Sequence, residues 1–156
     1  MNIKSESSQS DESPATQETT PPQIGILLQY IKDLSFENPS APNSLTKTNS
    51  APDIQVNVEV EARPLESDSY EVALHITANG KNGTSNLFIV DLTYAAVCRI
   101  INVPKESLQP ILLVECPRLI FPFARRVLSD ATRDGGFPPL MLNPIDFLAL
   151  YDKQHS

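Results

Sequence analysis

Residues 53–62, DIQVNVEVEA, alternate between polar and apolar side chains without interruption. The apolar side chains are those of Ile54, Val56, Val58, Val60 and Ala62. Because successive side chains of a strand point to opposite faces, this pattern predicts a strand buried on one side and wet on the other. Strands of this kind are typical of antiparallel sheets that have one solvent-facing surface.

Three further segments predict strands of the same sheet. Residues 69–78 repeat the alternation, and residues 29–37 follow it loosely. The segment Asn79–Gly83 contains two Asn-Gly pairs, which are a strong hairpin signal. The returning strand at 85–97 is apolar on both faces. Such a strand should be covered twice, or should present one face to a partner.

The apolar period changes to about 3.6 residues after Pro104, which predicts helices. Ser107 can cap a long helix that ends before Gly135, and Pro117 and Pro122 should kink or split it. A second, short helix should open at 143–146 and continue through residue 151. The predicted fold is therefore α+β: a four-stranded antiparallel sheet with one long kinked helix and one short C-terminal helix on one side.

Composition limits the class of partner. The 156-residue chain has a net charge of −7 and a pI near 4.7, which disfavours nucleic acid and anionic membranes and favours a basic or polypeptide partner. Residues 1–23 are rich in Ser, Thr, Pro and acidic residues, so we expect a disordered tail before a folded domain at 24–156. The tail has no apolar signal core, and the chain has no run long enough for a membrane helix. We therefore expect a cytoplasmic protein.

The strongest candidate for catalysis is Cys116, which is followed by several arginines. A phosphatase-like cradle needs an arginine six residues after the cysteine, and that position is Pro122. No histidine lies nearby to act as a base, and Glu115 should raise the pKa of the thiol. The cysteines and histidines also lack metal-ligand spacing. We expect no enzyme activity, no cofactor and no metal; an enzyme that uses Cys116 stays a distant alternative.

The chain has more apolar side chains after residue 118 than a small sheet can bury. They include Phe121, Phe123 and the FPPLML segment at 137–142. Two compatible interpretations are an oligomer interface and a groove that binds apolar segments of another chain. Charged residues on the strands, such as Asp33 and Glu37, are interpreted as a solvated face or, less often, a docking face.

Five short motifs together resemble the SecB family of bacterial protein-export chaperones. In chain order they are YIKDLSFENP at 30–39, DLTYAAV at 91–97, CP at 116–117 with FPFAR at 121–125, GFPPL at 136–140 and PIDF at 144–147. The resemblance runs from about residue 25 to the end of the chain.

The resemblance implies a homotetramer built as a dimer of dimers. It implies ATP-independent binding of unfolded preproteins and their delivery to the translocation ATPase SecA. The basic, zinc-bearing C-terminal tail of SecA would bind Asp33, Glu37, Ile89 and Asp91, so the zinc would belong to the partner. The alternative is a SecB-like chaperone dedicated to another system, such as a toxin–antitoxin pair.

Two further sets of residues follow from the same resemblance. The client-binding groove would include Phe36, Tyr94, Phe137, Leu140, Met141, Leu142 and Phe147. The oligomer interface would include Cys116, Leu119, Ile120, Phe123 and Val127.

Overall fold

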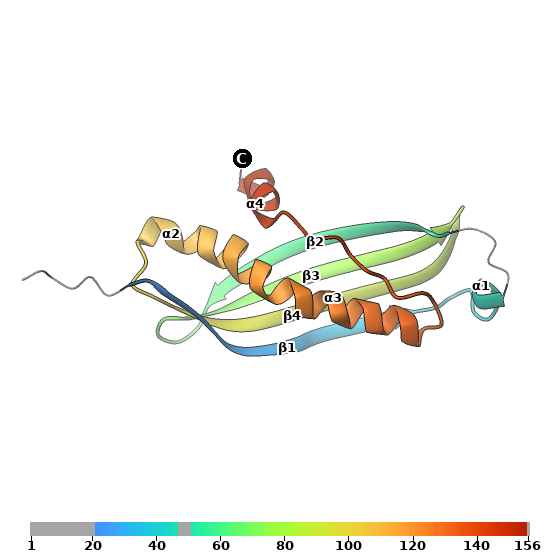
Figure 1. Cartoon of the computed structure of the whole chain (residues 1–156), viewed down its shortest axis with the longest axis horizontal. Helices are drawn as coiled ribbons and strands as arrows, with labels where there is room; N and C mark the ends of the chain where they lie inside the picture. The colour runs from blue at the N-terminus through green and yellow to red at the C-terminus, as the bar shows by residue number, and fades with distance from the viewer. Residues whose placement is uncertain (1–20, 47–50, 156) are drawn as a thin grey trace, which may run out of the picture.

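The computed structural model describes residues 21–46 and 51–155. The elements are β1 (Gln23–Glu37), α1 (Asn43–Thr46), β2 (Asp53–Pro64), β3 (Ser69–Asn82), β4 (Ser85–Ile101), α2 (Lys105–Pro110), the π-helical segment η1 (Ile111–Glu115), α3 (Cys116–Asp134) and α4 (Phe147–His155) (Figure 1). The expected disordered tail lies outside the described residues, apart from 21–23. Gln23 already belongs to β1, six residues before the predicted start of that strand.

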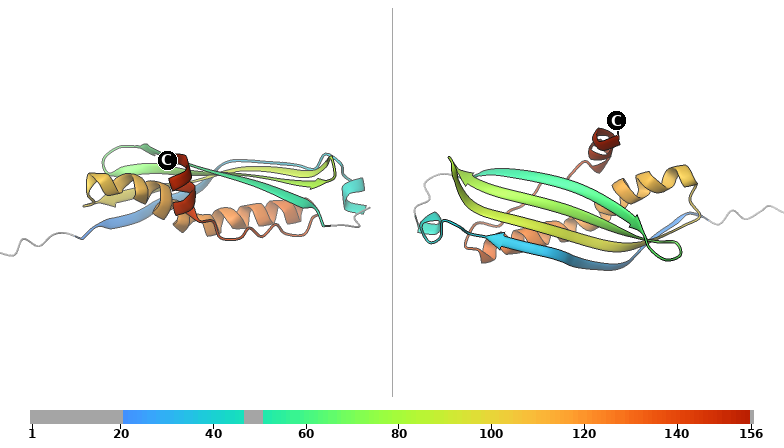
Figure 2. Two further views of the ribbon diagram at one scale, coloured as in Figure 1. Left: turned by 90° about the horizontal axis from the view of Figure 1, so that it is seen from above. Right: turned by 180° about the vertical axis from the view of Figure 1, so that it is seen from behind.

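The four strands form one antiparallel sheet in the order β1-β4-β3-β2. Hairpins join β2 to β3 and β3 to β4. The first strand, β1, pairs with the other side of β4. Figure 2 shows the helices on one side of this sheet and the other side bare. The α+β prediction, with one long kinked helix and one short C-terminal helix, is confirmed.

Only the second Asn-Gly pair makes the turn between β3 and β4. Asn82 pairs with Ser85, which leaves Gly83 and Thr84 as the loop, and Gly83 has a φ of +62°. Glycine adopts positive φ without steric cost, which explains its place in this two-residue loop. The first glycine, Gly80, lies inside β3 under the ring of Phe88.

The long helix begins earlier than predicted and contains an irregular segment. Its first residue is Lys105 and its N-cap is Pro104, so Ser107 lies inside the helix and is not the cap. Proline 117 has no N–H to donate to a preceding carbonyl, and the π-helical turn of η1 lies immediately before it. The predicted kink is therefore present.

The core lies between the sheet and one face of α3. Leu74, Ile76 and Leu92 on the strands meet Ile120 and Leu128 of the helix, and all five side chains are fully buried. The hydrophobic contacts that stabilise the sheet therefore lie on its helix-bearing side.

After α3, the chain runs back across the sheet before α4 (Figure 1). We predicted that α4 opens at 143–146, but it starts at Phe147. The side chain of Asp146 accepts a hydrogen bond from the backbone N–H of Ala149 at 3.0 Å. Asp146 therefore caps this helix, because its carboxylate satisfies a free N–H of the first turn. Phe147 anchors the helix through an edge-on contact with Phe121.

Candidate functional site

The four predicted SecA-binding residues lie side by side on the bare face of the sheet. A bulge between Ile31 and Asp33 places Asp33 opposite Thr93. Further along the same pair of strands, Ser35 lies opposite Asp91, and Glu37 lies opposite Ile89. These positions alternate with the buried residues Phe88, Val90 and Leu92, so they share the face that the helices leave bare.

The acidic side chains of this face differ in their partners. Within the described part of the chain, Asp33, Glu37 and Glu61 form no ion pair. Asp91 Oδ1 lies 2.8 Å from Nε2 of His75, and Glu59 Oε2 lies 3.8 Å from Nδ1 of the same imidazole. The face therefore offers several carboxylates to a basic partner, and two of them, Asp91 and Glu59, lie beside His75.

A further carboxylate of this face, Glu71, is almost completely covered. Its side chain is 8% exposed, and it accepts hydrogen bonds from Lys32 Nζ at 2.7 Å, from Arg63 Nε at 3.0 Å and from the hydroxyl of Tyr30. These donors come from β1 and β2, on either side of the β3–β4 pair. Ala95, which is opposite Tyr30 on β4, is small enough to let that side chain reach β3.

The cluster of Tyr30, Lys32, Arg63 and Glu71, called here the Glu71 cluster, shifts the pKa of its members. The hydrogen bond from Lys32, followed by those from Tyr30 and Arg63, lowers the pKa of Glu71 to about 2. Burial and the contact with Glu71 raise the pKa of Tyr30 to about 12. The sequence pattern does not predict the cluster, because Tyr30 and Lys32 of β1 are 41 and 39 residues away from Glu71 in the chain.

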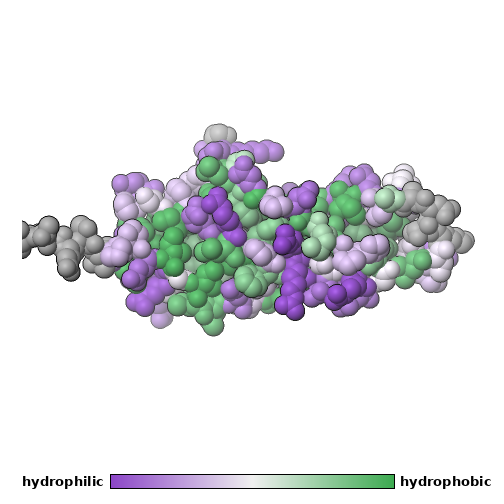
Figure 3. Space-filling model, in the orientation of Figure 1, coloured by the Kyte–Doolittle hydropathy of each residue, from purple (hydrophilic) through white to green (hydrophobic). Residues whose placement is uncertain are grey.

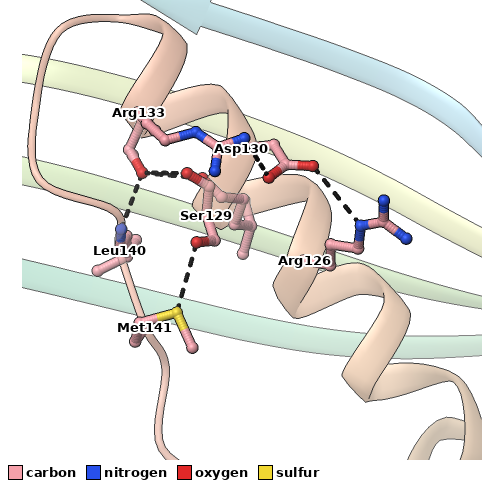
Figure 4. A network of polar contacts seen from close by, with 8 residues as sticks. Arg126, Ser129, Asp130, Arg133, Leu140 and Met141 are labelled. Carbon is pink, nitrogen blue, oxygen red and sulfur yellow. Dashed lines mark hydrogen bonds and ion pairs between the residues drawn. The ribbon is translucent and has the colours of Figure 1, made fainter.

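The segment after α3 is fixed to that helix by Thr132. The Thr132 hydroxyl is fully buried, lies 3.0 Å from the carbonyl oxygen of Leu128, and accepts a hydrogen bond from the N–H of Leu140 at 2.9 Å. Nearby, the hydroxyl of Ser129 contacts the sulfur of Met141 at 3.4 Å (Figure 4). Arg126 and Arg133 both pair with the exposed Asp130 on the same helix surface. The backbone of this segment is therefore held in place, and its side chains differ in exposure.

The residues predicted for a client groove fall into two groups. Phe147 is 1% exposed, and Tyr94 and Phe137 are each 8% exposed, so they belong to the core in this conformation. Phe36 packs on the ring of Phe88 and is half-buried. The remaining three also present apolar surface: Met141, which is 64% exposed, and the partly buried Leu140 and Leu142.

The residues predicted for an oligomer interface also fall into two groups, one buried and one with exposed surface. Cys116 and Ile120 have no exposed surface and pack against the sheet of their own chain. Leu119 and Phe123, about one turn apart on α3, are half exposed on the helix-bearing side. Phe123 and the half-buried Val127 line a shallow groove with Ile31 of β1 and Tyr94.

Apolar surface continues from this groove along β1. Figure 3 shows hydrophobic clusters on the helix-bearing side of the molecule. Large apolar side chains of β1 that are at least 40% exposed are Ile24, Leu27, Leu28, Ile31 and Leu34. β1 is an edge strand, so it also has an unpaired row of backbone groups.

The thiols do not have the surroundings of a catalytic site. Cys98 and Cys116 are both free and fully buried, and they contact each other between β4 and α3. The hydrogen bond with Cys98, together with burial, raises the pKa of Cys116, which favours the unreactive thiol. Among the described residues, there is no group of His, Cys, Asp or Glu side chains that could hold a metal. None of the described helices has the length and apolar character needed to cross a membrane.

Comparison with known proteins gives one consistent result. The family described as "Preprotein translocase subunit SecB" matches residues 17–156. A protein-export protein SecB from Azorhizobium caulinodans is 50% identical over 137 residues, which cover 88% of this chain and 86% of that protein. One from Rhodopseudomonas palustris (strain HaA2) is 53% identical over 131 residues, covering 84% of this chain and 83% of that protein.

A solved structure shares the fold. It is the SecB-like chaperone of Mycobacterium tuberculosis in complex with a ChAD peptide from the HigA1 antitoxin. Its TM-score is 0.61 at 18% sequence identity, and the match covers 78% of this chain and 90% of that one. At this identity the likeness concerns the fold alone.

Proposed function

Because the chain belongs to the SecB family of protein-export chaperones, we propose that it holds unfolded preproteins in the cytoplasm without ATP and delivers them to SecA. Membership makes the chain a chaperone of protein export, and the family is not one of enzymes. The relatives that are about half identical are export proteins, which favours general export over service to a toxin–antitoxin pair.

The observation that carries the docking part of this proposal is the bare acidic face. Asp33, Glu37 and Asp91 share that face with the apolar Ile89. A basic zinc-bearing tail of SecA would find carboxylates for its cations and one apolar contact among them. Attraction between such surfaces speeds encounter and is weakened by salt.

Client binding is proposed for the apolar surface on the other side of the sheet. Met141, Leu140 and Leu142 lie on a segment that is tied to α3 by Thr132, so apolar side chains are displayed on a fixed backbone. Methionine is flexible and polarisable, and it suits contacts with many different sequences. Phe137, Tyr94 and Phe147 would contribute only if the segment moved away from the core.

Self-association is proposed for the exposed apolar residues of α3 and β1. Leu119, Phe123 and Val127 would lie between dimers of a homotetramer. The apolar edge strand β1 is a second surface that another subunit would bury. Several client surfaces in one tetramer would bind one extended chain at many points, and this raises the overall affinity.

The docking and client-binding surfaces lie on opposite sides of the sheet, and one experiment tests them separately. The variant Asp33→Ala with Asp91→Ala should weaken binding to purified SecA about tenfold or more in titration calorimetry. Binding of a chemically denatured protein, followed by suppression of light scattering, should stay close to that of the wild type. If SecA binding survives unchanged, the acidic face is not the docking site; if the wild type ignores the denatured protein, the chaperone proposal fails.

A further inference from the structure

Cations and carboxylates are mixed on the bare face of the sheet. Asp33 lies opposite the outward-facing Thr93, and Glu61 and Arg63 lie opposite the outward-facing Ala73 and Glu71. A basic partner is attracted by the carboxylates and repelled by the cations, so its affinity depends on where the cations are held. In this structure both cations are bound by Glu71.

Lys32 is the cation closest in sequence to the docking carboxylates. It is the extra residue of the β1 bulge and immediately precedes Asp33, which faces the same side of the sheet. Its flexible side chain could reach the Asp33 carboxylate if it had no other partner. Glu71 instead holds the ammonium group at 2.7 Å, and Asp33 forms no ion pair within the described part of the chain.

We propose that Glu71 is a positioning residue of the docking face: it keeps Lys32 and Arg63 away from the carboxylates that a basic polypeptide partner binds. The inference rests on the proposed docking of such a partner to Asp33, Glu37 and Asp91. Glu71 itself is too covered to touch the partner, since only 8% of its side chain is exposed. It acts through the two cations, whose side chains are 46% and 62% exposed.

The geometry explains why one carboxylate is enough. Glu71 Oε1 accepts from both Lys32 and Arg63, and Oε2 accepts from the hydroxyl of Tyr30. All three donors therefore bind the same buried carboxylate. Because the hydrogen bonds lower the pKa of Glu71 to about 2, the carboxylate stays ionised at neutral pH.

The test measures binding of purified SecA to the full chain by titration calorimetry. Glu71→Gln should raise the Kd about tenfold at low salt, because two cations then become free to pair with Asp33 and its neighbours or to repel the partner. The triple variant Glu71→Gln, Lys32→Gln, Arg63→Gln should bind as tightly as the wild type or more tightly. In 0.5 M salt the difference between wild type and Glu71→Gln should largely vanish, because exposed charges are screened.

The controls separate this role from a structural one. Glu66→Gln, in the exposed β2–β3 loop, removes the same charge and should leave the Kd within about twofold. Suppression of aggregation of a denatured protein should be the same for every variant, which shows that each one is folded. Wild-type affinity in Glu71→Gln, or a triple variant that stays as weak as Glu71→Gln, would overturn the inference. A wild type that does not bind SecA would remove the docking proposal, and this inference with it.

Discussion

At the scale of single residues, the least expected feature is a glutamate that is buried on the bare side of a sheet. Glu71 is covered by the side chains that bind it, and no helix lies over it. A buried carboxylate without partners would be strongly destabilising, whereas one with three donors is satisfied. The cluster thus joins β1, β3 and β2 on the side of the sheet that has no hydrophobic cover.

The lowered pKa of Glu71 makes its contribution to stability dependent on pH. The folded-state pKa is about 2 against an ordinary value of 4.5, so the contribution is complete above about pH 5 and is lost as pH falls toward 2. We expect Glu71→Gln to lower the free energy of unfolding by on the order of 2 kcal/mol at pH 7, after allowing for the exposure of Lys32 and Arg63.

Urea unfolding at a series of pH values and a fixed protein concentration checks this prediction. The difference between wild type and Glu71→Gln should shrink steadily below pH 5. Glu61→Gln, an exposed carboxylate on β2 without an ion pair in the described part of the chain, is the matched control and should show a small difference. A difference that is the same at pH 3 and pH 7 would contradict the assigned cause.

The sequence predicts well on which face of the sheet a single residue lies. The alternation of residues 69–78 places Glu71 and His75 on the outward face. The partners of these residues could not be predicted, because Lys32 meets Glu71 only through the register of strands 39 residues apart. The sequence also did not predict that Cys116, Ile120 and Phe147 are buried in their own chain. An apolar residue that packs on its own sheet and one that contacts a partner give the same sequence pattern.

At the scale of elements, the β3–β4 hairpin depends on a close contact between Gly80 and Phe88. A Cβ atom on Gly80 would lie 2.4 Å from the Phe88 ring, far inside van der Waals contact. Gly80→Ala must therefore displace a ring that also packs on Phe36 and Phe137. We expect a loss of about 1–3 kcal/mol in the free energy of unfolding, measured by thermal and urea denaturation.

The matched control is Gly25→Ala in β1, where a Cβ atom would meet nothing within 4 Å. That substitution should change stability by no more than about 0.5 kcal/mol. Equal losses for the two variants would mean that the ring over Gly80 is not the cause.

The segment between α3 and α4 depends on one hydroxyl group. Thr132→Val keeps the shape of the side chain but leaves the N–H of Leu140 without its acceptor. We expect a loss of about 1–2 kcal/mol in stability and faster hydrogen exchange at Leu140 and its neighbours. Ser129→Ala, which removes only the exposed contact to Met141, should leave both measurements nearly unchanged.

Element boundaries were the least accurate part of the prediction. The alternation of residues 29–37 is loose because a bulge after Ile31 shifts its phase. A search for strict alternation does not detect a bulge, because one extra residue reverses the order of inward and outward side chains. The start of α4 was misplaced because Pro144 resembles a first helical residue, although the hydrogen bond that caps the helix comes from Asp146.

At the scale of the whole molecule, the hydrophobic core and the exposed apolar residues of α3 lie on one side of the sheet, and the proposed docking carboxylates lie on the other. Leu119 and Phe123 are about half exposed on α3, which is costly for a monomer in water. We expect Leu119→Asp with Phe123→Asp to reduce the mass measured by light scattering after gel filtration from that of the proposed tetramer to that of a smaller species.

A matched charge control is Leu65→Asp in the β2–β3 loop, which is also exposed but lies away from α3. It should leave the measured mass unchanged. A double variant that keeps the full mass would show that these two side chains do not lie between subunits. Concentration should be held fixed, because dissociation of an oligomer depends on it.

The bulge in β1 has a consequence for length variation in this protein. Lys32, between Ile31 and Asp33, has no partner residue on β4. Losing its codon would still leave Ile31 inward and Asp33 outward. Losing any single codon from 33–36 while the bulge is kept would instead turn Glu37 toward the core. Deletions in this strand should therefore be tolerated at one position and rejected at its neighbours.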